Sequence, residues 1–391
     1  MWINRKSSKL IQDTVIHYPV LFLTGPRQAG KTSLLKKLFP DYDYLTFDLP
    51  SVAEQAEKNP LEFISTLKRN TIIDEVQYAA RFLRYLKLEI DKKRINGRFI
   101  LTGSQNFLLM KDIGDSLAGR CAIIDLYSLS FNELKNFKNF RNISEIDFIL
   151  KGGYPQIWAD RGLSTDIFYS SYLSTYLERD IRNLLNVGKL RDFERFLRAL
   201  AIRSAQILSY SDLARDVGIA VSTAKEWISV LEASKQIYLL EPYYRNLGKR
   251  LIKSPKVYLN DVGLMCFLLG IENKSQLIKS PLAGAVWETF VFNEMIRYFS
   301  FKGRKPTIWY WRTRDGEEVD FIVEKNNKIN IFESKFSENP DKNDSKNIKK
   351  FITNFKKENI GNAGILCRTD RNYQFDKEDN IYLFNISILA Q

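Results

Sequence analysis

Residues 20–35, VLFLTGPRQAGKTSLL, decide the fold of this chain, because they join an apolar strand to a helix through a loop of the form G-x-x-x-x-G-K-T. The uninterrupted apolar run 20–23 is typical of a strand buried inside a parallel sheet. Gly25 and Gly30 bracket the loop, and glycine tolerates the positive φ angles that inward-facing backbone N–H groups require. The pattern predicts a phosphate-binding loop between a strand and a helix.

The residue types in this loop suit a nucleoside triphosphate with its magnesium ion. Lys31 opens the helix, where its ammonium can reach the β- and γ-phosphates beside the positive end of the helix dipole. Thr32 offers a hydroxyl to Mg²⁺. A glycine-rich turn without a ligand is the alternative, which the strand-to-helix context disfavours. We expect ATP to contact Gly25, Pro26, Arg27, Gln28, Ala29, Gly30, Lys31, Thr32 and Ser33.

A second acidic motif, TIIDE at residues 71–75, follows about forty residues downstream. A β-branched strand that ends in Asp-Glu beside a phosphate loop allows Asp74 to hold the Mg²⁺ shell and Glu75 to orient and deprotonate the attacking water. The apolar lead-in is short, so an exposed acidic turn is the alternative. Together with the loop, the motif predicts a site that hydrolyses ATP.

Two later motifs offer further catalytic candidates. A strand over residues 98–102 ends in GSQN, where Ser104 or Asn106 can sense the γ-phosphate and the lytic water. In SLAGR, residues 116–120, Arg120 can stabilise charge on the transferring phosphoryl group, in its own subunit or in a neighbour's. An ordinary surface arginine is an equal alternative.

The composition describes a globular protein of two or three domains, with 391 residues and 45% hydrophobic content. No apolar segment is long enough to span a membrane and no signal peptide is visible, so we expect a cytoplasmic protein. Three scattered cysteines and the single His17 argue against disulfides, His-rich metal sites and Ser-His or Cys-His nucleophiles. The net charge of +13 favours a polyanionic partner such as DNA, and a solvated basic surface is the alternative.

The sequence predicts a helical middle region. Three tyrosines fall on one face of an expected helix: Tyr169, Tyr172 and Tyr176. Such a stripe more often packs in a hydrophobic core than stacks on a nucleotide. A basic helical region follows, with Arg179, Arg182, Arg191, Arg195 and Arg198. Residues 210–243 then predict a winged helix-turn-helix in which Ser211 caps the first helix, Gly218 forms the turn and Ser222 begins the second helix. Trp227, Val230 and Leu231 would face inward, whereas Thr223, Lys225 and Glu226 would face out toward DNA bases. A role in protein packing is the equal alternative, although residues 245–256 supply five cations for phosphate contacts.

The last hundred residues contain a third constellation. Glu288 lies on an expected helix, Asp320 lies in the second strand of a hairpin that turns at Asp315-Gly316, and Glu333 and Lys335 share one face of the next strand. Asp320, Glu333 and Lys335 match the D…(D/E)-x-K arrangement of metal-dependent nucleases, in which carboxylates bind Mg²⁺ and the lysine activates water. The motif is short and degenerate, so a nuclease-like fold without cleavage stays open.

With these pieces in place, the chain resembles the prokaryotic AAA-type ATPases that carry a C-terminal domain of uncharacterised function with a restriction-endonuclease-like core. The matching stretches are GPRQAGKT, IIDEVQ, LTGSQ, SLAGR, GGYP, the helix-turn-helix run, KSPKVYLNDVGL and EEVDFIV…FESK. One departure is LYSLS at residues 126–130, where a proline is expected before Leu129. The resemblance implies an ATP-binding domain of the AAA type, a winged-helix middle and a nuclease-like end.

The fold class that follows is α/β: an AAA-type parallel-sheet domain (1–130), a helical linker or lid region (131–205), a winged helix-turn-helix (206–280) and a restriction-endonuclease-like domain (281–391). We expect a Mg²⁺-dependent ATPase whose nucleotide state controls a DNA-associated, nuclease-like module. An ATP-gated metal-dependent DNA nuclease and a non-cleaving, nucleotide-dependent switch that recognises another protein are the alternatives. A homo-oligomer is compatible with either.

Overall fold

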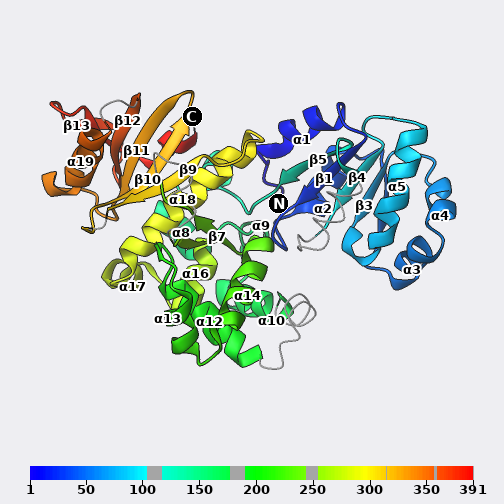
Figure 1. The fold of residues 1–391 in the computed structure, drawn as a ribbon, viewed down its shortest axis with the longest axis horizontal. Helices are drawn as coiled ribbons and strands as arrows, with labels where there is room; N and C mark the ends of the chain where they lie inside the picture. The colour runs from blue at the N-terminus through cyan, green and yellow to red at the C-terminus, as the bar shows by residue number, and fades with distance from the viewer. Residues whose placement is uncertain (104–116, 177–189, 244–253, 314, 356–358, 391) are drawn as a thin grey trace.

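The computed structural model describes residues 1–103, 117–176, 190–243, 254–313, 315–355 and 359–390. Figure 1 shows three regions in chain order: a parallel sheet flanked by helices, a largely helical middle and a second sheet near the C-terminus. Among the described residues, no helix has both the length and the apolar character needed to cross a bilayer.

The first region is built on five strands in the order β2-β3-β4-β1-β5, and every neighbouring pair is parallel. Val20 and Phe22 of β1 pack against α3 to α5, whereas Leu21 and Leu23 pack on the side of α1 and α2. Both faces are therefore covered, which explains why the β1 sequence is apolar from Val20 to Leu23. The elements are α1 (Ser7–Val15), β1 (Val20–Thr24), α2 (Lys31–Leu38), β2 (Asp43–Thr46), α3 (Pro50–Lys58), α4 (Pro60–Thr66), β3 (Thr71–Asp74), η1 (Val76–Tyr78), α5 (Ala80–Lys92), β4 (Phe99–Thr102) and β5 (Cys121–Asp125).

The middle region consists of helices and a three-stranded sheet in the order β6-β8-β7. Its elements are α7 (Phe131–Lys135), η2 (Lys138–Phe140), α8 (Glu145–Lys151), α9 (Pro155–Ala159), α10 (Thr165–Tyr176), α12 (Leu190–Ile202), β6 (Gln206–Ile207), α13 (Tyr210–Val217), α14 (Val221–Ala233), β7 (Ile237–Leu240), β8 (Lys256–Leu259), α16 (Val262–Leu269) and α17 (Lys274–Lys279). The pairs β6–β8 and β7–β8 are both antiparallel. Among the expected basic residues, Arg179, Arg182 and residues 245–253 lie outside the described residues. Of the basic run 245–256, the structure describes residues 254–256.

The helix pair of the predicted helix-turn-helix forms, with corrections at its start. Ser209, not Ser211, caps α13, because its hydroxyl accepts the backbone N–H of Asp212. Gly218 ends α13 in the left-handed conformation that the turn requires. The second helix, α14, begins at Val221, one residue before Ser222.

The side chains of α14 largely divide as expected. Trp227 and Leu231 are buried, Val230 is half-buried and packs against the same core, and Ile228 is also buried. Lys225 and Glu226 are exposed, and Thr223 is half-buried. The helix pair α13–α14 and the antiparallel β7–β8 pair are thus present, while their identity as a winged helix stays a prediction.

The third region is a mixed sheet in the order β13-β14-β12-β11-β10-β9. Helix α19 packs on one face, where Ile348 and Phe351 join the sheet residues, and α18 packs on the other, where Phe292 meets Phe321. The elements are α18 (Ala283–Phe301), β9 (Ile308–Arg312), β10 (Glu318–Lys325), β11 (Lys328–Ser334), η4 (Lys342–Ser345), α19 (Lys346–Asn354), β12 (Ile360–Leu366), β13 (Tyr373–Asp376), β14 (Ile381–Phe384) and η5 (Ile386–Ala390).

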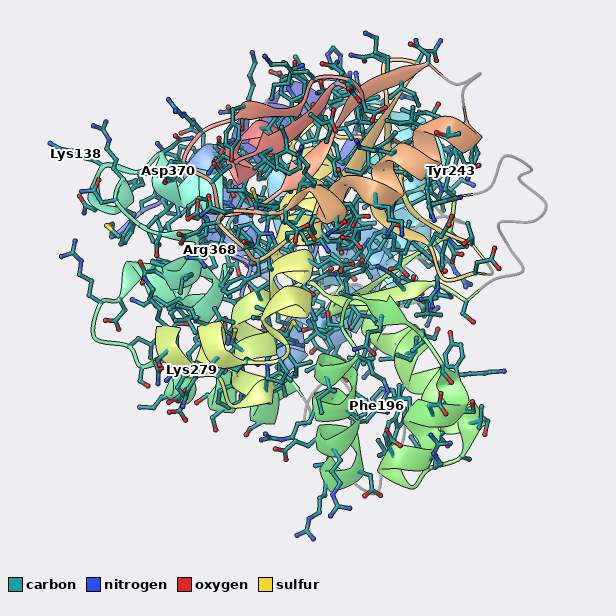
Figure 2. The ribbon with its side chains drawn as sticks, turned by 90° about the vertical axis from the view of Figure 1, so that its left-hand side faces the viewer. Lys138, Phe196, Tyr243, Lys279, Arg368 and Asp370 are labelled. Atoms are coloured by element: carbon teal, nitrogen blue, oxygen red, sulfur yellow. The ribbon has the colours of Figure 1, made fainter. Side chains whose placement is uncertain are left out.

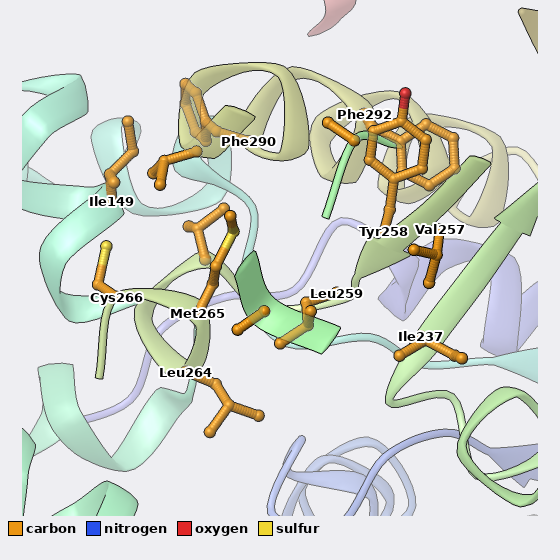
Figure 3. Packing of buried hydrophobic residues seen from close by; sticks show 14 of the residues in the cluster. Ile149, Ile237, Val257, Tyr258, Leu259, Leu264, Met265, Cys266, Phe290 and Phe292 are labelled. Atoms are coloured by element: carbon orange, nitrogen blue, oxygen red, sulfur yellow. The ribbon is translucent and has the colours of Figure 1, made fainter. Parts of the chain in front are cut away.

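One hydrophobic cluster unites the middle region with α18 and part of the last sheet. In Figure 3 the ring of Tyr258, on β8, lies against Phe292 of α18, with ring centroids 4.2 Å apart. The segment after β7 also reaches the last sheet: the backbone N–H of Tyr243 donates to the carbonyl of Tyr310 on β9 at 2.6 Å. Figure 2 labels Tyr243 beside the C-terminal region and Phe196 among the helices of the middle region below it. The middle and C-terminal regions therefore share a core.

The buried carboxylate of Asp261 joins segments of the middle region that lie far apart in the sequence. Asp261 caps α16 and also accepts the backbone N–H of Gly153 at 2.9 Å and the hydroxyl of Tyr169 at 2.9 Å. A Cβ on Gly263 would lie 2.3 Å from the Tyr169 hydroxyl and 2.5 Å from the nitrogen of Gly152. The GGYP and NDVGL stretches thus need glycine because two backbones touch there.

Candidate functional site

The loop after β1 has the backbone geometry of a phosphate cradle. Gly25 has a φ of +138°, and a Cβ at this position would lie 2.0 Å from the carbonyl oxygen of Leu126. Gly30 has a φ of +90° and immediately precedes α2. The Lys31 ammonium donates to the carbonyls of Gly25 at 2.9 Å and Pro26 at 3.0 Å, so its side chain folds back over the loop. An anion in the loop would meet this ammonium and the N-terminus of α2 together.

Asp74, at the end of β3, gathers three hydroxyl groups. Its Oδ2 accepts the hydroxyls of Thr32 at 2.8 Å and Tyr44 at 3.0 Å, and its Oδ1 accepts the hydroxyl of Thr102. Burial and the nearby charge of Asp74 raise the pKa of Tyr44 to about 12, so Tyr44 acts here as a neutral donor. The Thr32 hydroxyl and the Asp74 carboxylate converge on one point, and these are oxygen ligands of the kind that Mg²⁺ prefers.

Glu75 follows Asp74 in an unusual backbone conformation. Its φ of 58° and ψ of 47° lie in the left-handed region, which costs a non-glycine residue roughly 1 kcal/mol. The side chain lines the same cavity as the phosphate loop, and the amide of Gln77 donates to its Oε2. The strained backbone therefore holds a carboxylate at the mouth of the loop, where a general base for water would stand.

The cavity at this site has a volume of about 1000 Å³. One wall is the loop, a second is the N-terminal segment with Trp2 and Arg5, and a third comes from the middle region with Pro155 and Tyr172. Arg5 fixes the N-terminal wall, because its guanidinium donates to the carbonyl of Ala29 at 2.9 Å and pairs with Glu133 at 3.1 Å. The cavity is therefore shared between the first and middle regions.

Arg120, the other expected catalytic residue that the structure describes, does not line this cavity. Ser104 and Asn106 lie outside the described residues. Arg120 precedes β5, and its carbonyl accepts the backbone N–H of Val20 at the start of β1. In a parallel sheet that is the edge opposite the loop, and Arg120 pairs there with Asp91 at 2.5 Å. Arg120 therefore does not reach the cavity of its own chain, and a role in a neighbouring subunit stays a prediction.

The C-terminal carboxylates come together as the sequence predicts. Phe321 pairs with Phe332 across β10 and β11, which puts Asp320 opposite Glu333. Burial and the charge of Asp320 raise the pKa of Glu333 well above its usual range. Burial and the charge of Asp320 also raise the pKa of Glu288, on α18, to about 7. Lys335 is half-exposed and pairs with Asp344 at 3.3 Å.

A residue that was not among the expected site residues occupies the centre of this cluster. The ammonium of Lys256, on β8, lies 2.9 Å from Glu288 Oε1 and 3.5 Å from Asp320 Oδ1, and it also contacts Glu318. Burial lowers the pKa of Lys256, but the surrounding carboxylates outweigh burial and hold it well above its usual value. Among the residues that the structure describes, no three His, Cys, Asp or Glu side chains are arranged to hold a metal ion.

Comparison with known proteins identifies the first region. The model of a family described as an AAA domain matches residues 17–135, and two models described as domains of unknown function, DUF8612 and DUF4143, match residues 144–275 and 283–389. An uncharacterized protein of Mycobacterium tuberculosis is 30% identical over 344 residues, covering 87% of this chain and 76% of that protein, and one of Mycobacterium bovis matches equally. The chain belongs to the family of these mycobacterial proteins. Its first region is an AAA-type P-loop domain.

More distant relatives and solved structures extend this comparison. An uncharacterized protein of Methanocaldococcus jannaschii is 23% identical over 395 residues, covering 93% of this chain and 85% of that protein. Among solved structures, a Walker-type ATPase of Pyrococcus abyssi is 16% identical with a TM-score of 0.41, covering 68% of this chain and 96% of that chain. A RuvB variant of Thermotoga maritima is 17% identical with a TM-score of 0.32, covering 60% of this chain and 89% of that chain.

Three residues at the AAA site were missed from the sequence. Tyr44 and Thr102 come from strands on either side of β3 and reach Asp74 only because the strand order is β2-β3-β4. The polar Thr102 at the end of an apolar strand was a usable signal. Arg5 carried no signal, because its partners Ala29 and Glu133 are 24 and 128 residues away in the chain.

Proposed function

We propose that this protein binds ATP with Mg²⁺ at the phosphate loop and hydrolyses it. The proposal is carried by Lys31, Thr32 and Glu75, which line one cavity of about 1000 Å³, together with Asp74, which accepts the hydroxyl of Thr32. Lys31 would neutralise the β- and γ-phosphates, while Thr32 and Asp74 would hold Mg²⁺, which supplies charge stabilisation when bound.

The hydrolytic step follows from the position of Glu75. Its carboxylate orients a water molecule and accepts a proton from it as the oxygen attacks the γ-phosphorus. The bond between the γ-phosphorus and the bridging oxygen breaks, and ADP leaves with the negative charge. Lys31 and the N-terminus of α2 stabilise that charge.

Substitution of the two catalytic residues separates binding from chemistry. We expect Lys31→Ala to lose binding of a fluorescent ATP analogue, and Glu75→Gln to keep binding while phosphate release falls by roughly 100-fold. Lys58→Ala, which removes an exposed lysine of α3 that does not line the cavity, is the control and should behave as wild type. Equal phosphate release by Glu75→Gln and wild type would remove the assigned role of Glu75.

We also propose that nucleotide state controls the middle and C-terminal regions. Tyr172 lines the nucleotide cavity, and its hydroxyl accepts the side-chain amide of Gln236, next to β7, at 2.8 Å. Lys235 pairs with Asp125, at the end of β5, at 3.2 Å. A change at the cavity thus acts directly on the β7–β8 hairpin. Tyr172→Phe should keep ATP affinity but reduce the ATP-dependent change in hydrogen exchange at β7, and an unchanged exchange pattern would contradict the coupling.

DNA is the proposed partner of the winged-helix-like middle, on the basis of the +13 charge and the exposed face of α14. Filter binding of DNA against salt, with and without ATP, tests this, because phosphate-driven binding weakens steeply as salt rises. Salt-independent binding would instead favour the non-cleaving switch that recognises a protein. An ATP-gated nuclease at Glu288, Asp320, Glu333 and Lys335 is the remaining alternative, and plasmid cleavage with Mg²⁺ or Mn²⁺ tests it.

A further inference from the structure

The buried ammonium of Lys256 contacts Asp320, one of the two carboxylates that would bind the metal ion of a D…(D/E)-x-K nuclease. Its side chain is only 2% exposed, and it comes from β8 in the middle region. The carboxylates around it, Glu288, Glu318 and Asp320, come from α18 and β10 of the C-terminal region. One cation from the middle region thus pairs with three acidic side chains of the C-terminal region.

The carboxylates that surround Lys256 are held by protein donors. An ammonium has three N–H donors, and Lys256 faces three carboxylates. Glu288 Oε1 also accepts the hydroxyl of Tyr258 at 2.6 Å, and Asp320 Oδ2 accepts the backbone N–H of Ser334 at 2.8 Å. Glu288 Oε1 and both oxygens of Asp320 are therefore already bonded to protein donors, whereas Glu333 Oε1 has no hydrogen-bond partner among the described residues.

The surroundings hold Lys256 in place. The ring of Tyr310 lies 5.7 Å from the ammonium, and the Tyr310 hydroxyl donates to the carbonyl of Ser254, two residues before Lys256. Tyr258, on the same strand, stacks on Phe292. A divalent cation bound to Asp320 would lie beside this ammonium, and two neighbouring cations repel strongly in a buried site.

We propose that Lys256 is the resident cation of this cluster and excludes a divalent metal from it. The C-terminal region is then not a metal-dependent nuclease, and its acidic cluster instead locks the β7–β8 hairpin to α18 and β10. The inference goes beyond the proposed ATPase function and stands without it, because no residue of the nucleotide cavity takes part.

Mn²⁺ titration of the full chain without nucleotide, counted by electron paramagnetic resonance, tests the proposal. We expect wild type and Asp320→Asn to bind the same number of Mn²⁺ ions. Lys256→Met should gain one site with at least tenfold higher affinity than any Mn²⁺ binding of wild type, and Lys256→Met with Asp320→Asn should lose it. Lys335→Met, which removes a lysine at the rim of the cluster, is the matched control and should gain none.

Two results would overturn the proposal. One is wild-type Mn²⁺ binding that disappears in Asp320→Asn, and the other is a folded Lys256→Met variant that gains no Asp320-dependent site. If Lys256→Met does not fold, the comparison of wild type with Asp320→Asn still decides, since equal ion counts support exclusion and unequal counts refute it. Lys256→Arg keeps the charge and should also exclude Mn²⁺.

Discussion

Replacing Arg5 by methionine tests whether the N-terminal segment is part of the nucleotide site. The Arg5 side chain is 4% exposed and that of its partner Glu133 is 0% exposed. Besides this ion pair, the guanidinium donates to the carbonyls of Ala29 at 2.9 Å and Tyr127 at 2.6 Å. Methionine fills similar space without charge, so the variant removes these bonds and leaves Glu133 without its cation.

The expected cost follows from these contacts. Removing one partner of a buried ion pair costs about 3–5 kcal/mol, and an unsatisfied carbonyl adds about 1 kcal/mol. Glu133 keeps the backbone N–H groups of Lys6 at 2.8 Å and Ser130 at 2.9 Å, which offset part of the loss. We expect Arg5→Met to lower the free energy of unfolding by about 4 kcal/mol. Because Ala29 belongs to the phosphate loop, the Kd for ATP should rise by roughly tenfold.

Urea denaturation followed by tryptophan fluorescence measures the first quantity, and titration with a fluorescent ATP analogue measures the second. Arg5→Met combined with Glu133→Gln should recover about 2 kcal/mol, because the buried charge is then gone. Lys9→Met, an exposed lysine on α1, is the control and should change stability by less than about 0.5 kcal/mol. A loss below about 1 kcal/mol in Arg5→Met would refute the reasoning.

Two further predictions concern Glu294, a buried acid on α18, and Thr102, whose hydroxyl lies at the AAA site. Burial raises the pKa of Glu294 from 4.5 to about 7, so its stability contribution is full below about 4.5 and is lost as pH rises through about 7. Glu294→Gln should therefore flatten the fall in unfolding free energy between pH 5 and 8 by up to roughly 3 kcal/mol, and parallel urea-denaturation profiles for the two proteins would contradict this. Thr102→Val removes the hydroxyl that donates to Asp74, so phosphate release should fall about tenfold while the Kd for ATP changes less than threefold. Unchanged phosphate release would show that Asp74 does not depend on Thr102.

The residues of the nucleotide site were largely predictable because most of them lie in two short stretches of consecutive residues, 25–32 and 71–75. The spacing of Gly25, Gly30, Lys31 and Thr32 fixes a loop before a helix, and the structure places all four in that arrangement. The partners of Asp74 depend instead on which strands are neighbours, which local sequence does not state. The position of Arg120 was within reach, because a residue before a parallel strand lies at the edge opposite a loop that follows one.

The C-terminal cluster shows a different limit. The sequence motif predicted that Glu288, Asp320 and Glu333 lie close together, and the structure places them together. Lys256 appeared in the sequence only as one of five cations suited to phosphate contacts. Its burial depends on the pairing of β8 with β7 and on the packing of β8 against α18, both of which are long-range. A lysine that the sequence predicts to be exposed, such as Lys256, can thus be the counter-ion of a buried acidic cluster.

These contacts define a continuous physical route from the nucleotide cavity to the C-terminal region. Helix α10 supplies Tyr172 to the cavity and, one turn earlier, Tyr169 to Asp261. Asp261 also accepts the hydroxyl of Ser128 at 3.1 Å, and Arg297 on α18 donates to that same hydroxyl at 2.7 Å. Every step is a buried hydrogen bond, so a shift of α10 must either move α18 or break a bond whose loss costs about 1–3 kcal/mol. Lys256 ties the same helix to the β7–β8 hairpin through Glu288, so the proposed nucleotide control and the acidic cluster meet at α18.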